Sequence, residues 1–284
     1  MKKPNIFIDE NAGFCFGVTK AINTAEDFLK KDSLFCLGEL LHNETEMNIL
    51  KNKGLKVISY SNIENLSNSP ILFRAHGEPK STYDKVKKNN NVIIDATCPI
   101  VKQLQKNVIK SYNNGENIFI FGKESHPEII GIVGNINNDA VVFNSLEELK
   151  KIELPESITL YSQTTLNPKK FNEVIEYLKS KNVKLNAIDS ICNSVKKRLL
   201  TIEEFCLNHD LIIFISGKNS SNGKSLFRIC ESINKNSFHI ASTEEIKREW
   251  FNENLNSVGI SGATSTPKRL LNEVKDFILN LLNY

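Results

Sequence analysis

Short apolar runs alternate with longer amphipathic segments along almost the whole chain. The runs at residues 34–38, 71–75 and 211–216 are rich in Leu, Ile and Phe, which is typical of strands buried on both faces of a parallel sheet. Between such runs, segments such as 18–31 and 168–180 carry apolar residues at helical spacing. The alternation predicts an α/β protein in which helices cover small, mostly parallel sheets.

Three cysteines divide this pattern into parts of nearly equal length. Each cysteine follows a strand-like run and precedes a helix-like segment, and an aspartate lies upstream of each. The cysteines are Cys15, Cys98 and Cys192, and the aspartates are Asp9, Asp95 and Asp189. Such regular spacing indicates an internal repeat.

The repeat predicts three similar lobes, each a mostly parallel four-stranded sheet covered by helices. The first two parts each contain four predicted strands, whereas the third contains three and needs the N-terminal strand at residues 5–8. We therefore expect lobes at residues 16–97, 98–191 and 192–284, with residues 1–15 completing the third. Because ligands collect at the carboxyl ends of parallel strands, we expect a pseudo-threefold arrangement of the lobes around a central site.

The six cysteines fall into two groups. Cys36, Cys206 and Cys230 lie inside apolar-periodic segments, where a small buried thiol is the simplest interpretation. The three repeated cysteines indicate a metal centre instead. Zinc is one option, although structural zinc sites usually have local ligand pairs such as CxxC, which this sequence lacks. Thiolates from remote positions suit an iron–sulfur cluster, and three of them leave one iron open for a substrate.

Polar residues recur at matching positions in the loops of the three lobes. The loops after the first strand of each lobe carry His42, His126 and Ser220, and those after the third strand carry His76, Thr164 and Ser265. Any one of these residues could be a helix cap or a surface residue, but the repetition favours one shared centre. Hydroxyls, imidazoles and helix N-termini together suit a phosphate or diphosphate.

The segment SGKNSSNGKS at residues 216–225 looks like a nucleotide-binding P-loop but does not match that motif. Five residues separate Gly217 from Gly223, whereas the P-loop has four between its two glycines. We therefore expect a phosphate-binding turn rich in Ser and Asn rather than a nucleotide site.

Composition narrows the class of protein further. The chain is 40% hydrophobic and 24% charged, as in ordinary globular proteins. Its net charge of +3 gives no support for a nucleic-acid or membrane-surface partner. The sequence has no apolar run close to the roughly 20 residues that cross a bilayer, and its start does not resemble a signal peptide. We expect a cytoplasmic protein.

Motifs at the cysteines, histidines and hydroxyls span almost the whole chain in a fixed order. They are GFCFGV, LLHN, RAHG, DATCP, SHPEIIG, SQTTL, SIC, KNSSN and SGATSTP. Together they resemble the motifs of the 4-hydroxy-3-methylbut-2-enyl diphosphate reductase family, an iron–sulfur family of the non-mevalonate isoprenoid pathway. The resemblance implies one 4Fe–4S cluster, and its three ligands would be Cys15, Cys98 and Cys192.

The resemblance also implies roles for the other motif residues. The residues that would bind the diphosphate are His42, His76, His126, Ser220, Ser221, Asn222 and Ser265. Thr164 and Glu128 would face the allylic hydroxyl of the substrate, and Glu128 would supply the proton with which that hydroxyl leaves as water.

The implied reaction is a reductive dehydroxylation that yields isopentenyl and dimethylallyl diphosphates. Its two electrons would come from a ferredoxin or flavodoxin. Two interpretations from other classes stay open: a non-catalytic iron–sulfur redox sensor, and a zinc-stabilised module that binds phosphate esters. The sensor would explain neither the phosphate-like ring of donors nor Glu128.

Overall fold

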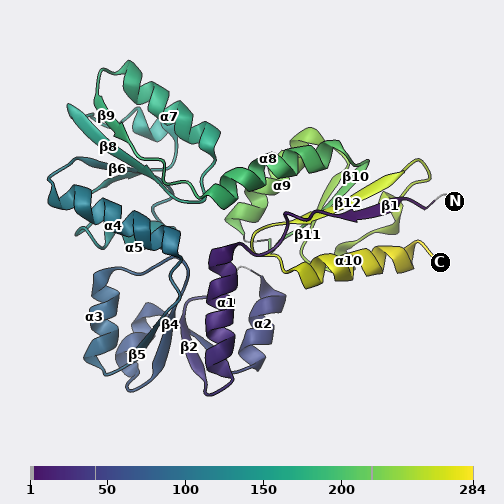
Figure 1. Ribbon diagram of the computed structural model, residues 1–284, viewed down its shortest axis with the longest axis horizontal. Coiled ribbons are helices and arrows are strands. Elements are labelled where there is room, and N and C mark those ends of the chain that lie inside the picture. Colours follow the sequence, from purple (N-terminus) through teal and green to yellow (C-terminus); the bar gives the residue numbers. More distant parts are fainter. Residues whose placement is uncertain (1–2, 42, 219, 284) are drawn as a thin grey trace. The chain divides into compact units, whose positions relative to one another are not determined.

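The computed structural model describes residues 3–283 except 42 and 219 (Figure 1). Its strands form three four-stranded sheets, and every strand pair within them is parallel. The first sheet has the order β3-β2-β4-β5, the second β7-β6-β8-β9 and the third β1-β12-β10-β11. The predicted α/β class with three parallel four-stranded sheets is therefore confirmed.

The strands are short, and their bounds follow the apolar runs of the sequence. In the first sheet they are β2 Leu34–Leu37, β3 Leu55–Ile58, β4 Pro70–Phe73 and β5 Val92–Asp95; in the second, β6 Ile118–Phe121, β7 Val141–Phe143, β8 Ser157–Ser162 and β9 Lys184–Ala187; in the third, β1 Asn5–Ile8, β10 Leu211–Ile215, β11 Ser237–Ile240 and β12 Ser257–Gly262.

Helices follow most of the strands. They are α1 Phe16–Leu29, α2 Glu44–Asn52, α3 Lys80–Lys88, α4 Pro99–Asn113, α5 Pro127–Val133, α6 Leu146–Leu149, α7 Pro168–Ser180, α8 Asn193–Leu207, α9 Ser221–Ile233 and α10 Lys268–Leu281, with short 3₁₀ turns at Tyr60–Asn65, Thr243–Glu245 and Arg248–Trp250. In the described part of the chain, none of them has the length and apolar character that a membrane span requires.

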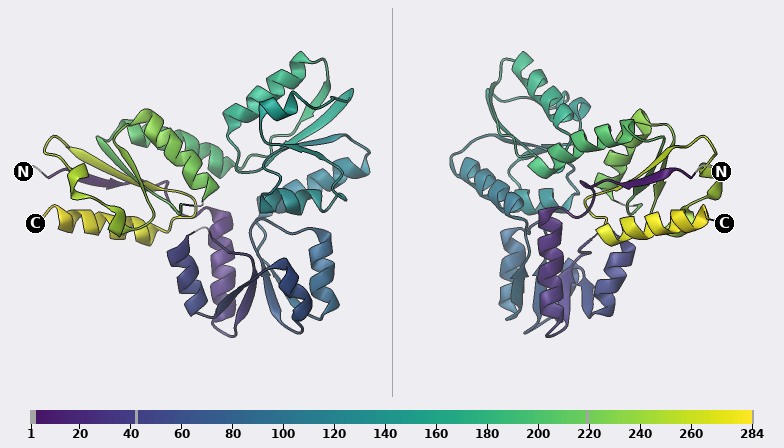
Figure 2. Two further views of the ribbon diagram at one scale, coloured as in Figure 1. Left: turned by 180° about the vertical axis from the view of Figure 1, so that it is seen from behind. Right: turned by 45° about the vertical axis from the view of Figure 1, so that its right-hand side comes forward.

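The third sheet shows how the apolar pattern positions its layers. In β10, Ile213 packs in one apolar cluster with Val274 of α10, while its neighbour Ile212 packs in another with Ile202 of α8 and Leu226 of α9. Successive side chains of a strand point to opposite faces, so both faces of β10 are buried. The N-terminal strand β1 pairs with β12 at one edge, and α10 contacts it (Figure 2).

The chain forms two compact units. The first unit comprises Met1–Thr19, Leu41–Ile49 and Lys197–Tyr284 and contains the third sheet; the second comprises Lys20–Leu40 and Leu50–Lys196 and contains the other two sheets. The lobe boundaries at residues 97 and 191 stay a prediction.

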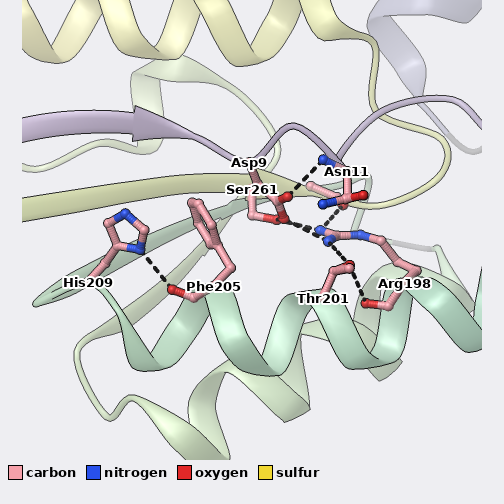
Figure 3. Close-up of polar contacts among 8 residues, drawn as sticks. Asp9, Asn11, Arg198, Thr201, Phe205, His209 and Ser261 are labelled. Carbon is pink, nitrogen blue, oxygen red and sulfur yellow. Dashed lines mark hydrogen bonds and ion pairs between the residues drawn. The ribbon is translucent and has the colours of Figure 1, made fainter.

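A buried ion pair fixes the end of β1 in the first unit (Figure 3). Arg198 of α8 donates from Nη1 to Asp9 Oδ2 at 2.7 Å, and the Ser261 hydroxyl donates to the same oxygen at 2.9 Å. Asp9 and Arg198 are only 3% and 4% exposed. Buried charges are tolerated when they are paired and hydrogen-bonded, so each of these two residues depends on the other.

We expect Arg198→Met to lower the free energy of unfolding by about 3–5 kcal/mol, because it leaves the Asp9 carboxylate buried without its cation. Urea denaturation of the cluster-free protein measures the change. The matched control is Lys179→Met, which removes one partner of the exposed Lys179–Glu176 pair and should cost less than about 1 kcal/mol. A cost for Arg198→Met no larger than that of the control would contradict the prediction.

Candidate functional site

Glu128 and Thr164 form a buried polar contact in the second unit. The Glu128 carboxylate accepts two hydrogen bonds of 2.7 Å from Thr164, one from its backbone N–H to Oε1 and one from its hydroxyl to Oε2. Glu128 is 2% exposed and Thr164 4% exposed. The sequence predicted both residues to face one substrate group, and the structure places them in direct contact.

Local chain geometry sets the position of Glu128. His126 caps the N-terminus of α5 by accepting the Glu128 N–H at its Nδ1, at 3.2 Å, and Pro127 occupies the first helical position. Proline is well suited to that position, where its missing N–H leaves no helical bond unmade. Glu128 thus lies in the first turn of α5, next to the histidine predicted to bind diphosphate.

Burial raises the pKa of the Glu128 carboxyl, and the two hydrogen bonds from Thr164 oppose this effect without cancelling it. Desolvation disfavours the charged carboxylate. Glu128 therefore holds a proton at a higher pH than an exposed glutamate does, as a general acid requires.

The two described histidines of the predicted diphosphate site lie side by side. The rings of His76 and His126 are 5.4 Å apart between centroids and nearly perpendicular, at 82°. His76 lies in the turn after β4, where the Gly77 N–H donates to the Arg74 carbonyl oxygen at 3.2 Å. The turn after β4 and the start of α5 thus place His76 and His126, which follow strands of two different sheets, next to each other.

Glycines make this close approach possible. A Cβ atom added at Gly131 of α5 would lie 2.7 Å from the Gly77 carbonyl oxygen, closer than real Cβ atoms come to other atoms. Beside this contact, Asn135 accepts the Lys80 N–H at Oδ1, at 2.9 Å. The sequence analysis did not identify Gly131, although its place in the SHPEIIG motif was a usable signal.

Backbone hydrogen bonds connect Cys98 and Cys192 to segments that carry predicted substrate-binding residues. The Cys98 N–H donates to the carbonyl oxygen of Ala75, next to His76, at 3.0 Å, and the Cys192 N–H donates to that of Thr164 at 2.9 Å. Both thiols are free and partly buried, and each cysteine directly precedes a helix, α4 or α8. Their backbone bonds connect the predicted cluster ligands to the predicted substrate residues.

In the first unit, Ser220 and Asn222 lie at the start of α9, and Ser265 lies in the loop after β12. Asn222 Nδ2 donates to the Thr264 hydroxyl at 2.8 Å, and Ser220 caps α9 by accepting the Gly223 N–H at 3.1 Å. The Ser265 hydroxyl is buried without a hydrogen-bond partner among the described residues. Unpaired buried hydroxyls are costly unless a ligand or water satisfies them, so Ser265 is suited to contact a ligand.

His42, Ser221 and Cys15 complete the set of predicted site residues. His42 lies outside the described residues, and Ser221 begins α9 but its side chain is outside them too. Cys15 lies directly before α1, and its carbonyl oxygen accepts the Thr19 N–H at 2.9 Å. Like Cys98 and Cys192, it is partly buried and is not part of a disulfide.

The other three cysteines are buried, as their apolar surroundings in the sequence indicated. Cys36, Cys206 and Cys230 are 0%, 1% and 0% exposed. Burial raises the pKa of the Cys36 thiol to about 12, which disfavours the thiolate that metal binding needs. None of the three has access to a ligand from solvent.

The chemistry of the repeated cysteines fits a cluster, while their joint geometry stays a prediction. Cys98 and Cys192 belong to the second unit and Cys15 to the first. Among the residues the structure describes, there is no group of three or more His, Cys, Asp or Glu side chains arranged to hold a metal ion. Three reduced cysteines that each precede a helix N-terminus, where the helix dipole favours negative charge, are suitable ligands for iron.

Comparisons with known proteins agree on one family. The family model described as LytB protein matches residues 6–279. The 4-hydroxy-3-methylbut-2-enyl diphosphate reductases of Bacteroides fragilis and Bacteroides thetaiotaomicron are each 44% identical to the chain, over 95% and 97% of its length and 96% and 98% of theirs. A solved structure of (E)-4-hydroxy-3-methyl-but-2-enyl diphosphate reductase, described as the terminal enzyme of the non-mevalonate pathway, matches with a TM-score of 0.75 and 34% identity, covering 98% of this chain and 100% of that one.

Proposed function

The chain belongs to the LytB protein family, and from this premise we propose that it reduces 4-hydroxy-3-methylbut-2-enyl diphosphate to isopentenyl and dimethylallyl diphosphates. The reaction takes up two electrons and two protons and releases the allylic hydroxyl as water. The observation that carries the proposal is the buried Glu128–Thr164 pair, because a buried carboxyl with a raised pKa, held by a neighbouring hydroxyl, is suited to protonate an alcohol that must leave.

Separate groups of residues protonate the leaving hydroxyl and bind the diphosphate. Glu128 gives its proton to the leaving hydroxyl, and Thr164 orients the carboxyl through its two bonds. Histidines and hydroxyls bind the diphosphate, aided by α5 and α9, because the positive end of a helix dipole favours phosphate. The proposed diphosphate ligands are His42, His76, His126, Ser220, Ser221, Asn222 and Ser265.

We assign Cys15, Cys98 and Cys192 as the ligands of one 4Fe–4S cluster. When bound, that cluster supplies the two electrons and an open iron that acts as a Lewis acid on the substrate hydroxyl. A ferredoxin or flavodoxin is the proposed electron donor, and the cytoplasm is the proposed compartment.

Anoxic purification separates this function from the two alternatives. A brown protein that contains iron and sulfide contradicts the zinc-stabilised module. Turnover of the allylic diphosphate with a reduced viologen contradicts the non-catalytic sensor. A colourless zinc protein, or an iron protein without turnover, would contradict the proposal.

We expect Asn222→Ala to weaken binding of the allylic diphosphate by about 1–3 kcal/mol, because a charge-assisted hydrogen bond to phosphate is lost. Lys224→Ala is the matched control from the same turn and should leave the affinity nearly unchanged, because Lys224 is exposed and the segment does not match a P-loop. Titration calorimetry under anoxia measures both affinities. Binding of ATP that Lys224→Ala abolishes would contradict this interpretation.

A further inference from the structure

Three aspartates at the ends of strands share one hydrogen-bond geometry. Each accepts, at Oδ1, the backbone N–H of the residue two positions later in the chain. The pairs are Asp9 with Asn11 at 2.9 Å, Asp95 with Thr97 at 2.9 Å and Asp189 with Ile191 at 3.3 Å. Each bond closes the turn in which the chain leaves a strand and runs toward one of the repeated cysteines.

The second carboxylate oxygen of each aspartate binds a cation. Asp95 Oδ2 lies 2.6 Å from Lys102 Nζ, and Asp189 Oδ2 pairs with Lys196 Nζ. Both lysines lie in the first turns of the helices that begin after Cys98 and Cys192, four residues beyond the cysteine. The pattern D-x-x-C-x-x-x-K therefore occurs twice and ties each cysteine-bearing turn to its helix.

The cysteine of each D-x-x-C-x-x-x-K segment is held on both sides. Before it, the aspartate bonds the N–H of the preceding residue; after it, its own carbonyl oxygen accepts the lysine N–H, at 2.9 Å for Cys98 and 3.1 Å for Cys192. The ion pair joins the aspartate before each cysteine to the lysine after it, and so connects the two ends of the segment. The thiol stays partly exposed at the centre of the loop.

The third aspartate, Asp9, pairs with a cation from a distant part of the chain. Asp9 is paired with Arg198 of α8, and Ser261 of β12 contacts both side chains (Figure 3). Asp9 precedes Cys15 by six residues rather than three. This longer segment is anchored by a buried ion pair, whereas the two shorter ones have partly exposed pairs.

We propose that these three aspartate–cation pairs, Asp95–Lys102, Asp189–Lys196 and Asp9–Arg198, are positioning residues that hold the cysteine thiols in place for the iron–sulfur cluster. The inference rests on the proposed function, which assigns the three cysteines as ligands. Partners that orient metal ligands typically contribute 10–100-fold to metal affinity. The repetition of one geometry at three separate cysteines, with two sources of cation, supports a common role.

The test uses the cluster-loaded full chain under anoxia and measures the rate at which a chelator removes iron. We expect Asp95→Asn and Lys102→Met to release iron about 10- to 100-fold faster than the parent. Lys102→Arg keeps the positive charge and should restore near-parental retention. Asp210→Asn is the matched control, because Asp210, directly before β10, accepts the N–H groups of Asn256 and Ser257 and has no cysteine among the residues that follow it in the strand.

The outcomes distinguish this proposal from the proposed function. Faster iron release in Asp95→Asn and Lys102→Met, but not in Lys102→Arg or Asp210→Asn, supports the positioning role. Release at the parental rate in all four variants overturns the positioning role and leaves the cysteine ligands intact. A parent protein that binds no iron overturns both. Equal acceleration in Asp210→Asn overturns the positioning role by showing a general loss of stability.

Discussion

Replacing Glu128 with Gln is expected to lower turnover of the allylic diphosphate by at least about 10²-fold, within the 10²–10⁴-fold range typical of general acids. Gln keeps the size of the side chain and much of its hydrogen bonding to Thr164, but it has no proton to transfer. Cluster content and substrate affinity should be unchanged, because Glu128 is proposed neither as a cluster ligand nor as a diphosphate ligand. Anoxic turnover with a reduced viologen, together with iron analysis, measures these quantities.

The matched control is Glu124→Gln, four residues earlier in the loop before α5, where the side chain is exposed. It should retain parental turnover. In the parent, burial raises the pKa of Glu128, so the acid form persists to a higher pH than in an exposed glutamate and turnover should fall as pH rises through that pKa. The Gln variant should lack this descending limb. Near-parental turnover by Glu128→Gln with an intact cluster would show that the proton comes from water or from the diphosphate.

Serine at Cys15, Cys98 or Cys192 is expected to remove the cluster almost completely. A hydroxyl is a poor substitute for thiolate at iron, and the proposed cluster has only three protein ligands. Serine at the three buried cysteines should leave the protein brown, at a stability cost of about 1–3 kcal/mol for burying a hydroxyl. Iron and sulfide content after anoxic purification measures the difference.

The buried cysteines provide three independent controls for that experiment. Cys206 is the most informative, because it lies in α8, the helix that follows Cys192. Loss of the cluster in Cys206→Ser, with retention in Cys192→Ser, would contradict the assignment of ligands.

The sequence predicted the sheets well because their strands are apolar runs buried on both faces. It was less accurate at the strand ends. Residues 183–189 (VKLNAID) have a largely alternating, strand-like pattern, whereas β9 ends at Ala187. Beyond that point, the Ser162 N–H of β8 donates to the Ser190 hydroxyl oxygen at 2.8 Å instead of to a strand carbonyl oxygen. A side-chain hydrogen bond competing with the ladder has no signature in an apolar pattern.

For the candidate site too, the sequence identified individual residues but not the contacts between them. Motif residues such as Thr164 and Glu128 were identified from the sequence, but their direct contact joins residues 36 positions apart. The close approach of Gly77 to Gly131, and the pairing of Asp9 with Arg198, also depend on how separate elements pack. The period and spacing of residues predict elements and shared loops. They do not predict which side chains meet across a fold.

Product formation by the parent protein tests the central claim most directly. The anoxically purified full chain, supplied with a reduced viologen and 4-hydroxy-3-methylbut-2-enyl diphosphate, should convert it to isopentenyl and dimethylallyl diphosphates, detected by mass spectrometry. The account predicts both products, with two electrons consumed for each substrate molecule. An iron-loaded protein that leaves the substrate unchanged would contradict it.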